Sequence, residues 1–252
     1  MNKKGLLVVF FFGGIMVTSG FGLQSMMSPS PNEPESEMTV TGTPADNFPD
    51  EQRAQFCGSS TAKSTDYVQE FSIPTLCTNP LAVVTDYDGN VWFAETNTGN
   101  LGKFDPITET FTEYDNPTWP NGARSMMWGI DYSPDGSVWF TDESYDSVWT
   151  FSTLDEKYTR IGYPTESDSL PQRLLIDGSK IIINDFTGNK LTLLDPNQSG
   201  EEINYLSIPS PIDNSVTAGF AVDAKDNIWF TNWLFQQGGV LVKFNQNGYL
   251  DS

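Results

Sequence analysis

Histidine is missing from this 252-residue sequence. Its absence removes the commonest general base, the commonest metal ligand and every Ser-His or Cys-His nucleophile pair. Basic residues are scarce as well: 13 Lys and Arg stand against 33 Asp and Glu, for a net charge of −20. Because a phosphate backbone is bound by Lys and Arg that displace counterions, this balance disfavours nucleic acid as a partner, and equally an anionic lipid surface.

Cysteine is nearly absent too, since only Cys57 and Cys77 are present. Both lie beyond an apolar N-terminal segment that indicates export. In an oxidising exterior we expect a disulfide between them; two free thiols are the alternative.

The N-terminus reads as a targeting element. Lys3 and Lys4 precede an uncharged, mostly apolar run over residues 5–23. At the helical rise this run spans roughly 28 Å, about the thickness of a bilayer's hydrocarbon core, and the lysines direct the rest of the chain outward. We expect a signal peptide or membrane anchor over 1–23, the length of the run favouring an anchor. An extracytoplasmic protein, secreted or membrane-anchored, follows from either.

Residues 24–65 are rich in Pro, Ser, Thr and Glu and poor in apolar side chains. Such a segment buries too little surface to offset its ordering entropy, so we expect a flexible linker. The folded domain is then predicted over residues 66–252.

That domain is built from a repeat. A core phrase built around Val-Trp-Phe or Ile-Trp-Phe recurs along the chain, with one degenerate copy. The four copies lie, in order, at residues 90–95, 137–142, 180–185 (the degenerate copy) and 227–232, and successive copies are 47, 43 and 47 residues apart. A period in the forties is typical of a four-stranded propeller blade, and large apolar groups on both faces of a strand suit blades packed face to face. We predict an all-β fold, a β-propeller of four-stranded antiparallel blades. Four repeats fit a small ring or part of a larger propeller.

A lone copy of the repeat's closing strand, YVQEFSIP at residues 67–74, stands before the first full unit. It matches TFTEYDNP at 110–117 and KYTRIGYP at 157–164. Propellers often close by letting a terminal strand complete the last blade. If the four repeats close a small ring, residues 67–74 pair with the third strand of the last unit, around residues 240–244; the alternative is part of a larger propeller.

The phrases DGNVWFAE, NLGKFDP and FTEY, between residues 88 and 114, and their copies resemble the streptogramin lyase (virginiamycin B lyase-like) propellers, neighbours of the gluconolactonase/SMP-30-like propellers. The resemblance covers about three quarters of the chain. It implies a seven-bladed propeller that opens a cyclic depsipeptide by elimination at an ester, with a His base and a Mg²⁺ held with help from a Glu. Without His, that base has no match here.

Two kinds of function follow. The first is a binding or scaffold domain for a small-molecule, glycan or protein ligand. The alternative is a divalent-metal-dependent lyase or lactone or ester hydrolase, which rests on the resemblance alone.

Acidic residues stand directly after the core phrases: Glu95, Asp142 with Glu143, and Asp185. If these strand ends converge near a central channel, their carboxylates offer the oxygen ligands that Mg²⁺ or Ca²⁺ prefers. The alternative is a set of strand-end residues with ordinary hydrogen bonds in turns.

Aromatic residues mark a second candidate surface. Arg124 and Trp128 precede the first strand of the second unit, while Trp119 and Trp233 fall in predicted loops. Exposed aromatic rings of this kind stack on sugars or peptide side chains. The alternative is packing between blades.

Overall fold

The computed structural model describes residues 62–119, 125–164, 169–195 and 205–246. The predicted targeting segment, nearly all of the predicted linker and Cys57 lie outside these residues, so the anchor, the linker and the Cys57–Cys77 disulfide stay predictions. Within the described ranges, the model contains no helix with the length and apolarity needed to cross a membrane.

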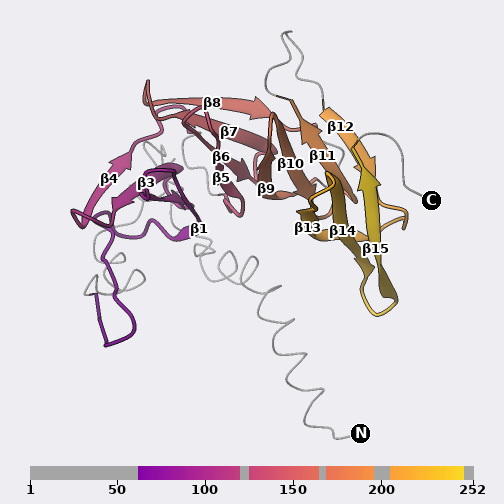
Figure 1. Cartoon of the computed structure of the whole chain (residues 1–252), viewed down its shortest axis with the longest axis horizontal. Helices are drawn as coiled ribbons and strands as arrows, with labels where there is room; N and C mark the ends of the chain where they lie inside the picture. The colour runs from indigo at the N-terminus through magenta and orange to yellow at the C-terminus, as the bar shows by residue number, and fades with distance from the viewer. Residues whose placement is uncertain (1–61, 120–124, 165–168, 196–204, 247–252) are drawn as a thin grey trace, which may run out of the picture. The chain divides into compact units, whose positions relative to one another are not determined.

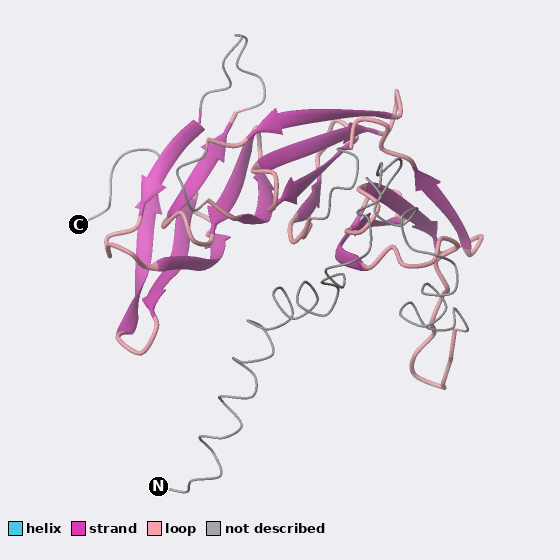
Figure 2. Cartoon of the chain, turned by 180° about the vertical axis from the view of Figure 1, so that it is seen from behind, coloured by secondary structure: helices cyan, strands magenta, loops and turns pink. Residues whose placement is uncertain are grey.

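The described strands form four antiparallel sheets, each following chain order (Figure 1). The first sheet is β1 (Pro80–Thr85), β2 (Val91–Glu95), β3 (Asn100–Asp105) and β4 (Thr110–Tyr114); the second is β5 (Ile130–Tyr132), β6 (Ser137–Asp142), β7 (Ser147–Ser152) and β8 (Lys157–Gly162). The third is β9 (Pro171–Asp177), β10 (Lys180–Asp185), β11 (Lys190–Leu194) and β12 (Tyr205–Pro209); the fourth is β13 (Val216–Val222), β14 (Asn227–Leu234) and β15 (Gly238–Asn245). Every regular element that Figure 2 draws in the described chain is a strand, which confirms the all-β, blade-like prediction.

The core phrase forms the second strand of each sheet, and in the first three sheets it is buried on both faces; in β14, Trp229 is half-buried and Thr231 is exposed. In β6, Val138, Trp139 and Phe140 are consecutive and all buried. Val138 and Phe140 belong to an apolar cluster shared with the first sheet, whereas Trp139 belongs to a cluster shared with the third. A strand sandwiched in this way has no wet face, which explains why its sequence does not alternate.

Acidic turns connect the first two strands, as the sequence predicts. Asp86 accepts hydrogen bonds from the backbone N–H groups of Asp88 and Asn90, and its second oxygen accepts one from Trp92 Nε1 at 2.9 Å. Although partial burial opposes it, these donors, Trp92 first, hold the pKa of Asp86 below its ordinary value. Asp223 repeats the arrangement with the indole of Trp229.

Backbone approach fixes the junction between the second and third sheets. A Cβ at Gly129 would lie 2.4 Å from the carbonyl oxygen of Gln172, so only glycine fits. The Gly129 N–H donates to Thr141 Oγ1 at 3.0 Å, and the Thr141 hydroxyl donates to the same Gln172 carbonyl at 2.6 Å. One side chain on β6 therefore links β5 to β9.

The closing-strand prediction for residues 67–74 is wrong in this structure. The segment forms no strand, and its described contacts are with the first sheet rather than with β15. The Phe71 ring packs on Phe104 at a centroid distance of 4.4 Å, and Thr75 donates to the Glu113 carboxylate. Aromatic packing on β3 therefore holds the segment in place.

Candidate functional site

The strand-end acids predicted as a metal site lie at the start of the turn between the second and third strands. Asp142 accepts a hydrogen bond from the N–H of Tyr145, three residues on, and Asp185 accepts one from Gly188 in the same way. Glu95 accepts from the hydroxyl of Thr98 instead, at 2.9 Å. Each side chain closes its own turn, which is the interpretation that the sequence left as the alternative.

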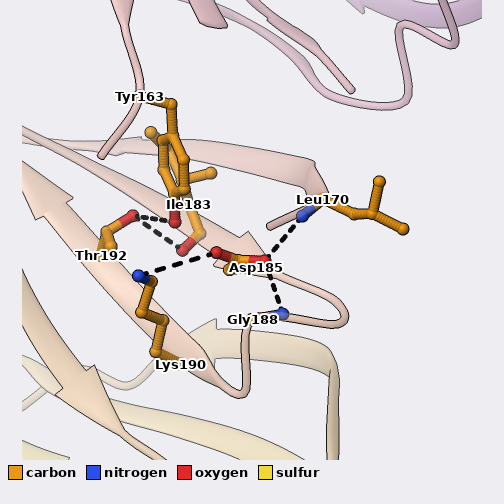
Figure 3. A network of polar contacts seen from close by, with 7 residues as sticks. All are labelled: Tyr163, Leu170, Ile183, Asp185, Gly188, Lys190 and Thr192. Carbon is orange, nitrogen blue, oxygen red and sulfur yellow. Dashed lines mark hydrogen bonds and ion pairs between the residues drawn. The ribbon is translucent and has the colours of Figure 1, made fainter. Parts of the chain in front are cut away.

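Asp185 shows how fully such a turn is bonded (Figure 3). Its Oδ1 accepts from the N–H groups of Leu170 and Gly188, both at 2.8 Å. Its Oδ2 lies 4.0 Å from Lys190 Nζ, an ion pair in which both side chains are buried, and has no hydrogen bond. Beside it, the Tyr163 hydroxyl is bonded to Thr192 Oγ1 at 2.9 Å. The Asp185 carboxylate is thus buried among groups of the protein itself.

Glu95 is the least satisfied member of the set. Its side chain is completely buried, and Oε1 has no hydrogen-bond partner. Burial, and after it the nearby Glu113 carboxylate, raises the pKa of Glu95 to about 8. The raised pKa favours the protonated carboxyl, which is the form of Glu95 that burial penalises least.

The predicted acids come from three different turns, those that follow β2, β6 and β10. Mg²⁺ and Ca²⁺ need several oxygens around a single point. Within the described ranges, no three or more Asp, Glu, Cys or His side chains gather closely enough to hold a metal ion. Burial raises the pKa of Asp146, and the charges of Asp185 and Asp142 add to the rise. We derive no chemistry through a metal, and the metal site stays a prediction.

A repeated hydroxyl escaped the sequence reasoning. Each strand-end residue is preceded, 16 or 17 positions earlier, by a buried Ser or Thr: Thr78, Ser125, Ser169 and Ser215. Ser125 Oγ donates to Asp142 Oδ1, and Asn232 Nδ2 donates to Ser215 Oγ at 3.3 Å. Aligning the repeats upstream of the first strand would have revealed this position.

The most accessible functional candidate is a tryptophan held in a fixed orientation. Trp128 lies just before β5 and leaves 41% of its surface exposed. Its indole N–H donates to Glu143 Oε2, which also accepts from Gln172 Nε2 at 3.2 Å. These three residues, which we call the Trp128 platform, come from the second and third sheets and flank the junction fixed by Gly129. Gln172 was not predicted, because its approach depends on packing between sheets.

At the Trp128 platform, the Glu143 carboxyl accepts hydrogen bonds from both of its neighbours. Burial raises the pKa of Glu143, and the nearby Asp142 carboxylate adds to the rise, while the donors Gln172 and Trp128 oppose it. The carboxyl therefore serves both as an acceptor for its neighbours and as a polar edge beside the exposed indole face. Such an aromatic plane with flanking polar groups is suited to orienting a ligand.

The other predicted aromatic residues do not join this surface. Trp119 is buried and packs on Trp149 at a centroid distance of 5.6 Å, so the expectation that it adds exposed surface is wrong. Trp233 is exposed, as expected, but lies within β14 rather than in a loop. Arg124 falls outside the described residues.

Comparison with known proteins finds similar folds among solved structures. A streptogramin B lyase has a TM-score of 0.56 at 20% identity, over 70% of this chain and 58% of that one. A virginiamycin B lyase from Staphylococcus aureus has a TM-score of 0.55 at 20% identity, over 70% of this chain and 59% of that one. The catalytically inactive variant of that lyase with quinupristin has a TM-score of 0.54 at 19% identity, over 69% of this chain and 58% of that one. This chain therefore spans less than two thirds of their length.

No family model matches the chain, and no curated protein does. At such identities the structural likeness establishes architecture alone. The resemblance to streptogramin lyase-like propellers that the sequence predicts is thus confirmed at the level of the fold: the described sheets are the blades of a β-propeller.

Proposed function

We propose that this chain is a ligand-binding propeller domain and that the Trp128 platform is its contact surface. The observation that carries the proposal is the half-exposed indole of Trp128, whose N–H is committed to Glu143. An exposed Trp normally loses rotamer freedom when it binds a ligand. Here the cost is already met by the hydrogen bond, and pre-organisation of this kind favours affinity.

The chemistry beside the indole favours a carbohydrate. The ring face offers a flat apolar surface, while Glu143 and Gln172 contribute a carboxyl and an amide at its edge. A sugar ring has one apolar face and a rim of hydroxyls, which matches this pairing of surfaces. The net charge of −20 disfavours an anionic ligand, so a neutral or cationic sugar is the expected class.

The N-terminus adds the second part of the proposal. The basic head and the apolar run over residues 5–23 support export, with the binding domain held at the outer surface by an uncleaved anchor. Cell fractionation and N-terminal sequencing of the purified protein test this part. A mature N-terminus beyond residue 23, with the protein in the soluble fraction, would refute the anchor and leave the binding proposal intact.

Binding is tested with a panel of neutral and cationic oligosaccharides, namely cello-, xylo-, chito- and chitosan oligomers, titrated into the full chain while tryptophan fluorescence is recorded. We expect one class to bind and Trp128→Ala to weaken its binding at least tenfold. The matched control is Tyr87→Ala, because Tyr87 is another exposed aromatic but lies in the β1–β2 hairpin. Equal losses in both variants, or no binding by any oligomer, would contradict the proposal.

The lyase alternative has its own assay. Quinupristin, present in one of the similar structures, is incubated with the chain and Mg²⁺ and followed by reverse-phase chromatography. A ring-opened product that forms faster than in buffer would favour the enzyme. Unchanged quinupristin together with oligosaccharide binding would favour the binding domain.

A further inference from the structure

The last sheet presents an unpaired edge. β15 pairs with β14 along eight residues, from Gly238 to Asn245. In the other three sheets the corresponding third strand has a fourth strand on its far side, namely β4, β8 or β12. Within the described part of the fourth sheet, nothing pairs with that side of β15. Its N–H and C=O groups are a template for another strand.

The face beside this edge is also open. Leu241 lies opposite Thr231 on β14 and is 65% exposed. Its equivalents in the other sheets are fully buried: Leu101, Val148 and Leu191. Each of those three packs in the cluster that its sheet shares with the following sheet. Leu241 is therefore the one position of the series, in the described residues, that has no following sheet.

The first sheet has the complementary opening. In each internal junction the leucine or valine of one sheet shares a cluster with an apolar residue on the first strand of the next: Leu101 with Ile130, Val148 with Leu174, and Leu191 with Phe220. The matching residue on β1 is Val83, which is 64% exposed. The face that would cover Leu241 is thus present in this chain, but it is not used within it.

Residues 67–74 carry the sequence pattern of a fourth strand. Their sequence repeats the phrase that forms β4 and β8, yet they form no strand, and Tyr67 and Val68 are exposed. Phe71 packs on Phe104 at 4.4 Å, just as the equivalent Tyr114 of β4 packs on Phe151 of the next sheet at 5.0 Å. The segment already lies against the first sheet as the closing strand of a preceding blade would.

We propose that two copies of this chain associate by docking the first sheet of one copy on the last sheet of the other. Residues 67–74 of one copy then become the fourth strand beside β15 of its partner. The register follows from the internal repeats. β4 places Phe111 opposite Phe104 and Tyr114 opposite Leu101, so Val68 should lie opposite Phe244, and Phe71 opposite Leu241.

Two such contacts can form at once if the copies are related by a two-fold axis, which closes the assembly. Each copy carries a net charge of −20, so repulsion opposes the contact at low salt. Association should therefore strengthen as ionic strength rises, the opposite of what a contact made by ion pairs would show.

The test mixes two differently tagged full-length chains in detergent, one carrying Glu70→Cys and the other Val242→Cys, and adds a short bismaleimide. These positions face each other in the proposed register. We expect a cross-linked pair that contains both tags and is at least tenfold more abundant than in a control mixture of Glu70→Cys with Tyr87→Cys. No hetero-pair at micromolar concentration would overturn the proposal.

Leu241→Asp tests which of the two chains contributes the β15 face to the cross-linked contact. Placed in the Val242→Cys chain, it should reduce the cross-link at least tenfold. Placed in the Glu70→Cys chain, it should reduce the cross-link much less, because it breaks only the second contact of the pair and leaves residues 67–74 of that chain able to dock on the intact β15 of the other. If the cross-link is lost to the same extent in both arrangements, Leu241→Asp has disrupted the fold. The test then uses Val83→Asp in the Glu70→Cys chain, which should also reduce the cross-link at least tenfold.

Two outcomes point to other occupants and refute the second copy. If a double variant with Glu70→Cys and Val242→Cys cross-links only within one chain, residues 67–74 close the fourth sheet in cis. If hydrogen exchange shows β15 protected while the chain sediments as a monomer, another part of the same chain covers the edge.

Discussion

Glu95 is expected to make this domain less stable as the pH rises. Its carboxyl is fully buried and one oxygen has no partner, and burial together with Glu113 raises its pKa to about 8. In the unfolded chain it titrates at its ordinary value of about 4.5. Between these values the folded state holds a proton that the unfolded state has lost. The free energy of unfolding must therefore fall as pH rises through this window, and it is highest below it.

The size of the effect follows from linkage. Each pH unit between the two pKa values corresponds to about 1.4 kcal/mol, so the whole window sets an upper bound of about 5 kcal/mol. Because part of the rise comes from the charge of Glu113, which is not fully buried and is screened by solvent, we expect about 2–3 kcal/mol. Glu95→Gln places an amide donor where the protonated carboxyl stands. It should match the unsubstituted chain near pH 5 and exceed it by that amount near pH 9.

Urea unfolding followed by tryptophan fluorescence, from pH 5 to pH 9, measures this difference. Glu109→Gln is the matched control, since it removes the same charge from an exposed position, and its curve should run parallel to that of the unsubstituted chain. Parallel curves for Glu95→Gln and the unsubstituted chain would refute the reasoning, because Glu95 would then be ionised in the folded state without cost.

Three further predictions concern turns, junctions and the thiols. Asp86→Ala should lower the free energy of unfolding by about 2 kcal/mol, because it leaves the buried Trp92 indole N–H unpaired. The control Asp88→Ala, in the same turn, should change that free energy by less than about 0.5 kcal/mol, and equal effects of the two variants in urea titrations would contradict the capping role of Asp86. Gly129→Ala should cost about 3 kcal/mol or more, because its Cβ would meet the Gln172 carbonyl at 2.4 Å, and a melting temperature within 2 °C of the unsubstituted chain, about 1 kcal/mol or less, would show that the junction yields easily. Cys57 and Cys77 should resist alkylation until reductant is added; full alkylation of both before reduction, seen by mass spectrometry, would rule out their disulfide.

The sequence predicted the sheets because their signals are local. The Val-Trp-Phe phrase forms a strand in both places where it occurs, β2 and β6. An acid followed closely by Gly or Asn closes a hairpin with its own backbone. These patterns act within about ten residues. The strands around Trp92 and Trp139, and the capped turn at Asp86, were therefore predictable without any knowledge of what packs on them.

Contacts between sheets were not predictable in the same way. Trp119 stands in a polar loop segment, yet it fills the space above Gly99, where any Cβ would collide with the indole. Gln172 reaches Glu143 only because Gly129 lets two backbones approach closely. Whether a loop side chain is buried, and whether a side chain contacts the neighbouring sheet, depends on residues that are distant in the sequence. For the candidate site, the sequence therefore singled out Trp128 but not Gln172.

The length of one side chain explains why the first sheet differs from its neighbours. Asp142 and Asp185 are short enough for a carboxylate oxygen to accept the N–H three residues on, and their turns consume them. Glu95, one methylene longer, accepts from the Thr98 hydroxyl in place of a backbone N–H, and besides its burial the charge of Glu113 raises its pKa.

Glu113 in turn accepts both donors of Thr75, the residue directly after the segment proposed as the shared strand. Ionising Glu95 would place a second negative charge beside the group that holds this segment. The proton on Glu95 and the attachment of residues 67–74 are therefore linked through a single carboxylate. Because Glu95→Gln removes only the titration and leaves both Thr75 donors in place, it separates the two effects.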